Sequence, residues 1–304
     1  MDFLYMLEKI RMPWLDKIML GITTFGEETA FLVVALVVFW CVDKYRGYYV
    51  LGVGLMGTLL SQFMKLLCRV PRPWVLDEKF TIVEDAREAA GGYSFPSGHT
   101  QSAVGTFGAI AASAKNKAVI AVCIAIAVLT SFSRMYLGVH TPADVLVGAG
   151  MALFLVLLLK KPVLEGGERT FQAILILLMT LSIGFLNYVE LSVFPADMDA
   201  HNLQSGMKNA YTAVGCMAGL YAVYYVEKKH IQFPTEAVWW AQVLKCLLGF
   251  ALVLLVKEGL RSPLEALFAG HMAARAVRYC LMVLVAGCVW PLTFRWFEKL
   301  GEKK

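Results

Sequence analysis

Long apolar segments separated by short polar links run through almost the whole chain. An apolar segment of about 20 residues is long enough to cross the hydrocarbon core of a bilayer as a helix. The segments of this kind cover residues 29–42, 47–67, 99–115, 117–133, 142–159, 170–194, 208–226, 238–256 and 276–297. The pattern therefore predicts an all-α fold, a polytopic membrane helix bundle with about nine transmembrane helices.

The N-terminal residues differ from these spans because charged side chains interrupt their apolar pattern. Residues 1–17 carry Trp14 as an aromatic suited to the headgroup level and Pro13 as a bend, so we expect an interfacial helix there. The span at 29–42 is short for a crossing, and we expect it to borrow length from residues 18–25.

The composition supports a membrane location. Of the 304 residues, 59% are hydrophobic and 17% are charged, whereas about a quarter of the residues of a soluble domain are charged. One globule of this size could not bury so much apolar surface, which argues against a soluble protein. The 7 cysteines are scattered, mostly within apolar runs, and no pair has the spacing of a metal or redox site.

Basic residues are unevenly divided between alternate loops. One set of loops carries Lys44, Arg46, Lys115, Lys117, Lys160, Lys161, Arg169, Lys228 and Lys229 and is followed by a basic C-terminal tail. The alternate set consists of residues 69–97, 134–141, 195–207 and 257–275, where acidic residues balance the basic ones of the first loop and 195–207 has no basic residue. The positive-inside rule places the first set in the cytoplasm and the second set outside.

This topology puts the N-terminus outside, the C-terminus inside, and the loops 69–97 and 134–141 on the same outer side. The net charge of +5 is modest and the basic residues lie mainly between apolar runs, so we expect no nucleic-acid partner. We interpret residues 1–160 as one membrane block and residues 161–304 as an additional membrane-helix block of unknown role.

Two clusters of polar residues lie at the expected outer ends of spans. Lys65 falls about one turn from the end of the second span, and Arg72-Pro73 follows just beyond it. A lysine inside an apolar span is costly and usually functional, although a lone lysine can also extend to the headgroups. The second cluster, Pro96-Ser97-Gly98-His99, leads directly into the third span. Its small residues leave helix N-terminal N–H groups open to an anion, although Ser97 could equally be a plain N-cap.

The third cluster is Ser133-Arg134, five residues, His140, three residues, and Asp144. Thr141-Pro142 is typical of a helix start, so His140 and Asp144 lie on one side of that start. There the carboxylate can hold one imidazole nitrogen and leave the other free, as a nucleophilic or basic histidine requires. The alternative interpretation makes Asp144 part of a capping box.

Taken together, the clusters bring cations, a helix N-terminus and two histidines to one side of the membrane. Lys65, Arg72 and Arg134 can stabilise the oxygens of a phosphoryl group as charge shifts during transfer. One histidine can attack phosphorus and the other can protonate the leaving group.

These three clusters, in this order and at this spacing, resemble the signature of the type 2 phosphatidic acid phosphatase superfamily, and every specified position agrees. The resemblance covers about residues 20–160 and implies a phosphatase core in the first half of the chain. It implies that His140 is the catalytic nucleophile and forms a phosphohistidine, that Asp144 orients it, and that His99 is the general acid. It further implies that Lys65, Arg72, Ser97, Gly98 and Arg134 bind the substrate phosphate.

The resemblance also implies that the enzyme needs no cofactor and no metal. The nearest candidate for metal ligands, Asp197, Asp199 and His201, lies in an acidic outer loop and is interpreted as solvated. We expect a lipid phosphate phosphatase in a bacterial plasma membrane, with its active site facing outside. Its substrate would be a phosphate monoester or diphosphate on a lipid, such as polyprenyl diphosphate, phosphatidic acid or a sphingoid-base phosphate. A lipid phosphotransferase with the same phosphohistidine, or a phosphatase of a soluble phosphorylated sugar, are the alternatives.

The second half of the chain carries no motif of this kind, but it has a basic cluster. Arg261, His271, Arg275 and Arg278 lie near the expected outer side. The cluster is interpreted as an anchor at the membrane interface, with contact to an anionic headgroup as the alternative.

Overall fold

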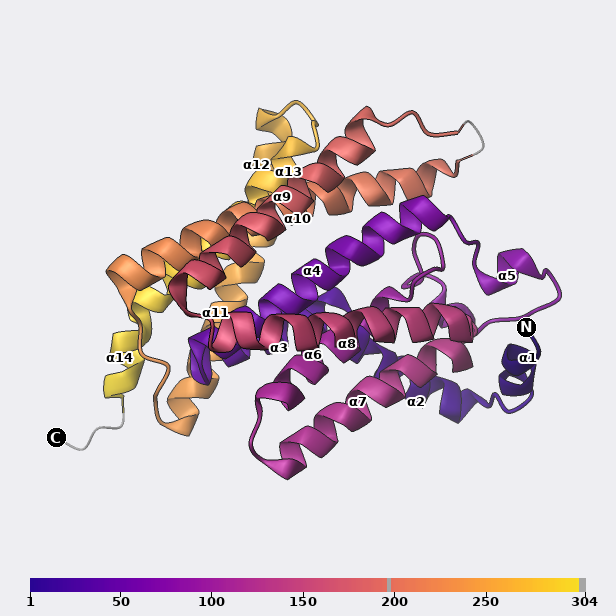
Figure 1. Ribbon diagram of the computed structural model, residues 1–304, viewed down its shortest axis with the longest axis horizontal. Helices are drawn as coiled ribbons and strands as arrows, with labels where there is room; N and C mark the ends of the chain where they lie inside the picture. Colours follow the sequence, from indigo (N-terminus) through magenta and orange to yellow (C-terminus); the bar gives the residue numbers. More distant parts are fainter. Residues whose placement is uncertain (196–197, 301–304) are drawn as a thin grey trace. The chain divides into compact units, whose positions relative to one another are not determined.

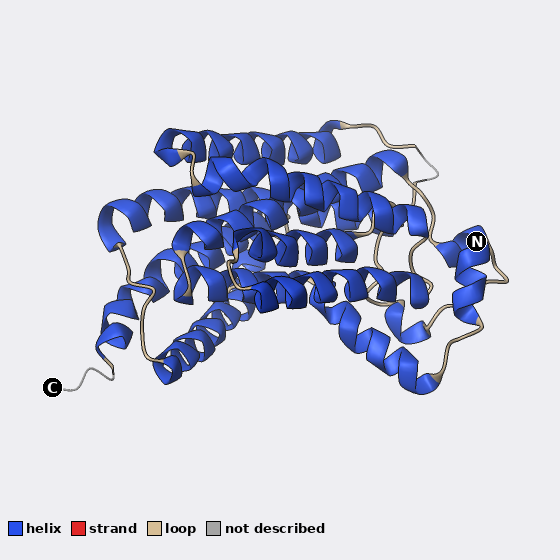
Figure 2. Cartoon of the chain, turned by 60° about the horizontal axis from the view of Figure 1, so that its bottom comes forward, coloured by secondary structure: helices blue, strands red, loops and turns tan. Residues whose placement is uncertain are grey.

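The computed structural model describes residues 1–195 and 198–300, and within them every regular element is a helix (Figures 1 and 2). The first half holds α1 (Asp2–Glu8), α2 (Pro13–Thr23), η1 (Thr24–Gly26), α3 (Glu28–Cys41), α4 (Lys44–Cys68), α5 (Pro73–Leu76), η2 (Glu84–Ala86), α6 (Gly98–Ser113), α7 (Lys117–Tyr136) and α8 (Pro142–Leu164). The second half holds α9 (Gly167–Leu191), α10 (Ala200–Val226), η3 (Glu227–Ile231), α11 (Trp239–Gly259), α12 (Arg261–Leu267), α13 (Ala273–Leu284), η4 (Val285–Val289), η5 (Trp290–Thr293) and α14 (Phe294–Lys299). The predicted all-α fold is confirmed.

The number of membrane spans is smaller than the sequence pattern predicts. Among the described residues, 6 helical stretches are long and apolar enough to cross a membrane: Lys44–Leu76, Lys117–Tyr136, Pro142–Leu164, Gly167–Leu191, Trp239–Leu267 and Ala273–Lys299. A seventh would be the pair Pro13–Gly26 and Glu28–Cys41, which is bent by 53°. The prediction of nine spans is therefore not confirmed.

The two remaining predicted segments are helical but do not meet the same test, for different reasons. Helix α6 has 16 residues, and a helix of that length rises only about 24 Å at 1.5 Å per residue, against about 30 Å of hydrocarbon. Helix α10 has 27 residues, but polar residues, glycines and tyrosines along its length lower its mean hydropathy.

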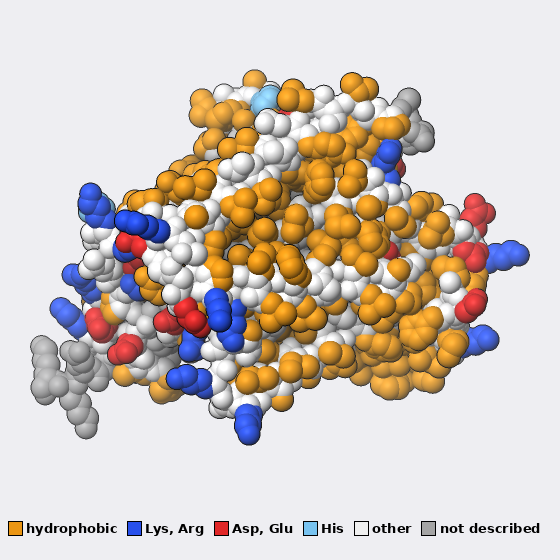
Figure 3. Space-filling view, in the orientation of Figure 1, with side chains coloured by type: hydrophobic (Ala, Val, Ile, Leu, Met, Phe, Trp, Pro, Cys, Tyr) orange, Lys and Arg blue, Asp and Glu red, His pale blue; other side chains and the backbone are white. Residues whose placement is uncertain are grey.

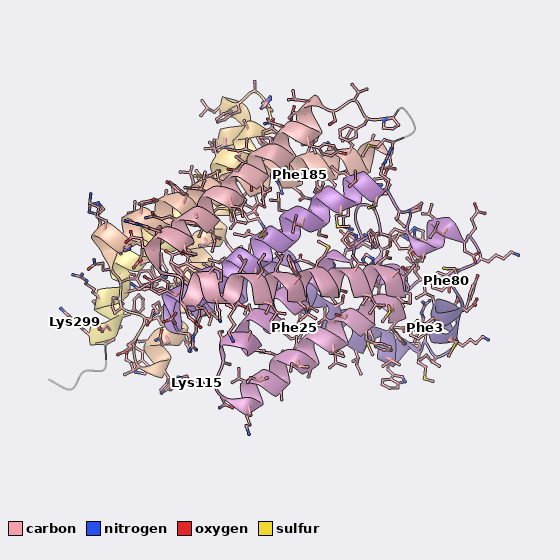
Figure 4. All side chains as sticks on the ribbon, viewed as in Figure 1. Phe3, Phe25, Phe80, Lys115, Phe185 and Lys299 are labelled. Atoms are coloured by element: carbon pink, nitrogen blue, oxygen red, sulfur yellow. The ribbon has the colours of Figure 1, made fainter. Side chains whose placement is uncertain are left out.

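The expected single interfacial helix at residues 1–17 is instead two helices. Helix α1 ends at Glu8, and Pro13 begins α2 in the first helical position, where its missing N–H costs no hydrogen bond. The loop after α5 packs on this N-terminal segment: the rings of Tyr5 and Phe80 meet edge to face at 5.4 Å, and Figure 4 labels Phe80 at this place.

The chain folds into two compact units. Unit 1 comprises residues 1–35, 49–165 and 194–206, and unit 2 comprises residues 36–48, 166–193 and 207–304. Hydrophobic side chains cover much of the face seen in Figure 3, with few charged side chains among them. Exposed leucines such as Leu146 and Leu157 on α8 are 71% and 73% exposed, which is expected where the solvent is lipid.

In unit 1, α6 packs along both α7 and α8, and α2 packs along α7. Glycines permit two close approaches of this bundle. A Cβ atom on Gly148 of α8 would lie 2.7 Å from the carbonyl oxygen of Ser97, and one on Gly26 would lie 2.7 Å from that of His99. The first turn of α6 is therefore held tightly between η1 and α8. Lys115, which follows α6, lies at the opposite end of this unit from Phe80 (Figure 4).

In unit 2, buried polar contacts tie α3 to the C-terminal helices. The indole nitrogen of Trp40 donates to the carbonyl oxygen of Ala286 at 2.9 Å. The fully buried Lys245 donates to the carbonyl oxygen of Trp40 at 3.0 Å. An isolated ammonium inside an apolar bundle is costly, and these contacts compensate part of that cost.

Candidate active site

Four helix ends of unit 1 meet around one cavity of about 500 Å³. Of the residues expected to form the site, five line this cavity: Lys65, Arg72, Gly98, His99 and His140. Ser97, Arg134 and Asp144 lie behind its wall, and each is at most 1% exposed. All eight belong to the same unit, so the structure brings together residues that are up to 79 positions apart, from Lys65 to Asp144.

His140 lies at the inner wall of the cavity and is 1% exposed. Its Nε2 atom lies 2.9 Å from Nη1 of Arg72. Because a guanidinium can only donate, Nε2 is the acceptor and the ring proton is on Nδ1. The free electron pair of the ring therefore faces the cation that also lines the cavity.

The other ring nitrogen of His140 faces a carboxylate and a hydroxyl. Nδ1 lies 3.5 Å from Oδ2 of Asp144 and 3.4 Å from Oγ of Ser94. The Ser94 hydroxyl donates to the same Asp144 oxygen at 2.6 Å. The three side chains thus form a buried polar network in which Ser94 lies between the ring and the carboxylate.

The local sequence explains the position of the Asp144 carboxylate. The Thr141 N–H donates to Asp144 Oδ2 at 2.8 Å, and the Asp144 N–H donates to Thr141 Oγ1 at 3.3 Å, which is a complete capping box at the start of α8. The two interpretations of Asp144 are compatible, since the oxygen that caps the helix also faces the histidine ring. The cap fixes the carboxylate one helical turn after His140.

Arg72 connects the long loop 69–97 to the loop between α7 and α8, which carries His140. Its guanidinium donates to the carbonyl oxygens of Gly91 at 2.8 Å, Gly92 at 3.0 Å and Val139 at 2.9 Å. Lys65 donates to the carbonyl oxygen of Tyr93 in the same loop. Both cations are buried and are held in place by the backbone of the loop rather than by carboxylates.

Arg134 is fully buried, and its environment leaves much of its guanidinium open. Nη1 donates to Oγ1 of Thr23 at 2.7 Å, whereas Nε and Nη2 have no hydrogen-bond partner within residues 1–195 and 198–300. A buried donor without a partner is costly. An anion beside these nitrogens would remove that cost.

The start of α6 matches the capping alternative for Ser97. Its hydroxyl accepts from the N–H of Thr100 at 3.4 Å and from the Thr100 hydroxyl at 3.0 Å. Gly98 and His99 face the cavity, and Nε2 of His99 is buried without a hydrogen-bond partner in the described part of the chain. This nitrogen is available to a bound group.

The electrostatics of the site keep His140 neutral. Burial lowers the pKa of His140 well below its ordinary value, and the positive charges of Arg72, Arg134 and Lys65 lower it further. A neutral imidazole has the electron pair that a nucleophile needs. The lining of the cavity also includes the carboxylates of Glu27, Glu28, Asp85 and Glu88, so cations surround the histidine while acidic groups occupy other parts of the lining.

Sequence reasoning missed Ser94 and Thr23. Ser94 precedes the second cluster by two residues, and Thr23 lies in the apolar N-terminal region, 111 positions from the arginine that it contacts. The available signal for such residues was a polar side chain within an apolar segment. The same signal marks Ser61 and Gln101, which line the cavity. Among the described residues no group of three or more His, Cys, Asp or Glu side chains could hold a metal ion, and Asp197 lies outside the described residues.

Replacing Ser94 with alanine is expected to lower the turnover number by about tenfold, because a buried charged acceptor loses one hydrogen bond. The measurement is phosphate release by the purified variant, with Ser113→Ala as the control, since the Ser113 hydroxyl donates only to carbonyl oxygens of its own helix. Unchanged turnover in Ser94→Ala would contradict a role for Ser94 in holding Asp144 and His140.

Two family models match the chain in separate regions. Residues 46–164 match the model described as the PAP2 superfamily, and residues 211–303 match the model described as PAP2 superfamily phosphatase, transmembrane extension. The fold and these matches define a multi-pass membrane phosphatase. The chain belongs to the PAP2 superfamily, which is the superfamily of type 2 phosphatidic acid phosphatases.

Two proteins of Bacillus subtilis (strain 168) are similar to about half of the chain. Phosphatidylglycerophosphatase B is 32% identical over 160 residues, which are 50% of this chain and 76% of that protein. Undecaprenyl-diphosphatase BcrC is 28% identical over 169 residues, which are 53% of this chain and 84% of that protein.

One solved structure is also similar, and it is described as the first transmembrane PAP2 type phosphatidylglycerolphosphate phosphatase from Bacillus subtilis. The sequence identity is 30% and the TM-score is 0.44, and the match covers 52% of this chain and 81% of that one.

Proposed function

We propose that the protein hydrolyses a phosphate monoester or diphosphate on a membrane lipid through a phosphohistidine on His140. The observation that carries this proposal is the environment of His140, a buried neutral ring whose Nε2 accepts a hydrogen bond from Arg72 beside the cavity. A substrate phosphate would replace the ring as the acceptor of that guanidinium. The same exchange would free the electron pair of Nε2 and bring phosphorus next to it.

In the first step, Nε2 attacks phosphorus, an N–P bond forms and the bond from phosphorus to the leaving oxygen breaks. His99, once it has taken up a proton with the substrate phosphate bound, gives that proton to the leaving oxygen when the leaving group is an alkoxide. In the second step, water attacks phosphorus with His99 as the base, the N–P bond breaks and phosphate leaves with His140 restored. Lys65, Arg72, Arg134 and the first turn of α6 stabilise the charge on the phosphoryl oxygens.

Asp144 stabilises the positive charge that develops on the ring when His140 carries the phosphoryl group. Its oxygen faces Nδ1 directly and through Ser94. Three protein cations supply the charge stabilisation that a metal ion gives in other phosphoryl transfer enzymes, so the proposed reaction runs without a metal.

The membrane arrangement supports a lipid as substrate. We propose that residues 1–160 are the phosphatase core and residues 161–304 an additional membrane block, and that α6 and α10 also cross the membrane, giving nine spans. Helix α6 starts at the cavity and returns through a short link to α7, and His140, which follows the far end of α7 by four residues, lines the same cavity. Helix α6 therefore has to traverse the same thickness as α7. The loop charges support a cavity on the outer side of the membrane, and we propose that this membrane is a bacterial plasma membrane.

The relatives support two kinds of lipid substrate. The names of the two relatives favour a phosphate on a glycerophospholipid or a polyprenyl diphosphate. The substrate candidates are polyprenyl diphosphate, phosphatidic acid and a sphingoid-base phosphate.

The test is phosphate release by the detergent-purified protein, with EDTA present, from farnesyl diphosphate, phosphatidic acid, sphingosine phosphate and glucose 6-phosphate. We expect release from at least one lipid that EDTA does not reduce. Release only from glucose 6-phosphate would favour a soluble substrate. No release unless an acceptor lipid or sugar is added would favour a phosphotransferase, and loss of release in EDTA would contradict the metal-free mechanism.

A further inference from the structure

Unit 2 contains a second cavity, of about 550 Å³, that shares no residue with the cavity of the active site. Helices α10, α11, α12 and α13 contribute residues to its wall, and Figure 1 labels these four helices. Five cationic side chains line it, Lys208, Lys257, Arg261, Arg275 and Arg278, and only two carboxylates do so, Glu258 and Glu265. The cavity is therefore strongly basic.

The carboxylates are engaged by the outer cations. Nε of Arg261 lies 3.4 Å from Oε1 of Glu265, and Nζ of Lys257 lies 4.0 Å from Oε1 of Glu258. These side chains are between 39% and 64% exposed, and such exposed ion pairs contribute little to stability. The two remaining arginines are held differently.

Arg275 and Arg278 lie one turn apart on α13 and have no salt bridge to a carboxylate within 4.0 Å among the described residues. Arg275 donates to the hydroxyl of Thr212 at 2.6 Å, and its Nη2 lies 3.4 Å from that of Tyr279. Arg278 is 8% exposed, and its buried Nε has no hydrogen-bond partner within the described ranges. A buried, unpaired guanidinium nitrogen beside a basic cavity is costly unless an anion enters.

The hydrogen-bond donors of the two arginines and the surface around the cavity indicate which kind of anion would bind. Two guanidinium groups one turn apart suit a phosphate, whose oxygens can accept from both. The neighbouring surface is apolar: Leu255 on the last turns of α11 is 70% exposed, and Leu267 on α12 is 77% exposed. Basic side chains next to exposed leucines at helix ends are typical of the level of lipid headgroups.

We infer that this cavity binds the phosphate of an anionic membrane phospholipid, held by Arg275 and Arg278. The site lies within the region that matches the transmembrane extension, apart from its contribution from Lys208. It uses no residue of the proposed reaction and does not require that the bound lipid be hydrolysed. It would give the second membrane block a function of its own, retention of a specific headgroup.

The test compares binding of dioctanoyl phosphatidylglycerol and dioctanoyl phosphatidylcholine to the full-length protein in detergent, by microscale thermophoresis. Arg278→Gln and Arg275→Gln are the pocket variants. Arg295→Gln is the matched control, since Arg295 is an exposed arginine of α14 in the same unit that does not line the cavity. The circular dichroism spectrum and the thermal unfolding midpoint of each variant report whether the protein is folded.

We expect at least about tenfold weaker binding of phosphatidylglycerol by either pocket variant, because each loses charged hydrogen bonds, and unchanged binding by Arg295→Gln. Phosphatidylcholine is expected to bind weakly to all. Equal binding of phosphatidylglycerol by the wild-type protein and a folded pocket variant would overturn the inference. If inorganic phosphate displaces phosphatidylglycerol at a comparable concentration, a soluble phosphate is the ligand and the lipid assignment is wrong. If Arg278→Gln does not fold, binding of phosphatidylglycerol by the more exposed variant Arg275→Gln tests the inference.

Discussion

Replacing His140 with alanine is expected to lower phosphate release by at least about 10³-fold, because the reaction then loses its nucleophile. The residual rate would come from the cations and the helix N-terminus, which still bind the phosphate. The decisive measurement is a rapid quench with substrate labelled on the transferred phosphorus. The wild-type protein should carry a label that is stable in alkali and lost in acid, as expected for an N–P bond, and His140→Ala should carry none.

The matched control is His230→Ala, because His230 is an exposed histidine in unit 2 and lies outside both cavities. It should retain full activity and full labelling. Labelled protein in the His140→Ala variant, or a rate within tenfold of the wild type, would show that another group attacks phosphorus.

Replacing Arg72 with lysine is expected to lower the turnover number by about 10²- to 10³-fold, although the charge is kept. The guanidinium donates to three backbone carbonyl oxygens and lies at Nε2 of the nucleophile. A single ammonium cannot reproduce this planar set of donors. Phosphate release gives the size of the loss, and inhibition by vanadate reports whether binding of a phosphate-like anion is lost with it.

Arg87→Lys is the control for this substitution. Arg87 is an exposed arginine of the same loop, and its guanidinium pairs with Glu84 at 2.7 Å instead of reaching the cavity. It should behave as the wild type. If Arg72→Lys loses less than about threefold in turnover, the guanidinium geometry does not matter and only its charge does.

Local chemistry determined most of the candidate site. Thr141-Pro142 and Ser97 each start a helix in the structure, because N-caps and a proline in the first turn depend only on neighbouring residues. Those two starts fix the chain positions of His99, His140 and Asp144 relative to helix ends. The spacing of apolar segments then predicts that the helix ends that carry them lie on one side of a membrane.

The count of spans was less well predicted, and the reason is physical. Hydropathy measures transfer of a segment into lipid, but α6 is short and polar residues such as Gln101 and Thr106 are buried within unit 1. A helix surrounded by other helices does not need to satisfy that measure. The bend of 53° between Pro13–Gly26 and Glu28–Cys41 also divides a stretch that periodicity alone treats as extra length for one span.

The sequence by itself determined the helical membrane fold, the three polar clusters and their order, because each follows from hydropathy or from contacts within a few residues. Only the tertiary structure decided that Ser94 bridges Asp144 and His140, that Thr23 holds Arg134, and that Arg72 donates to the ring of His140. These hydrogen bonds join residues 50, 111 and 68 positions apart. A hydrogen bond acts over about 3 Å, and which distant residues come that close depends on how the helices pack, which no local pattern records.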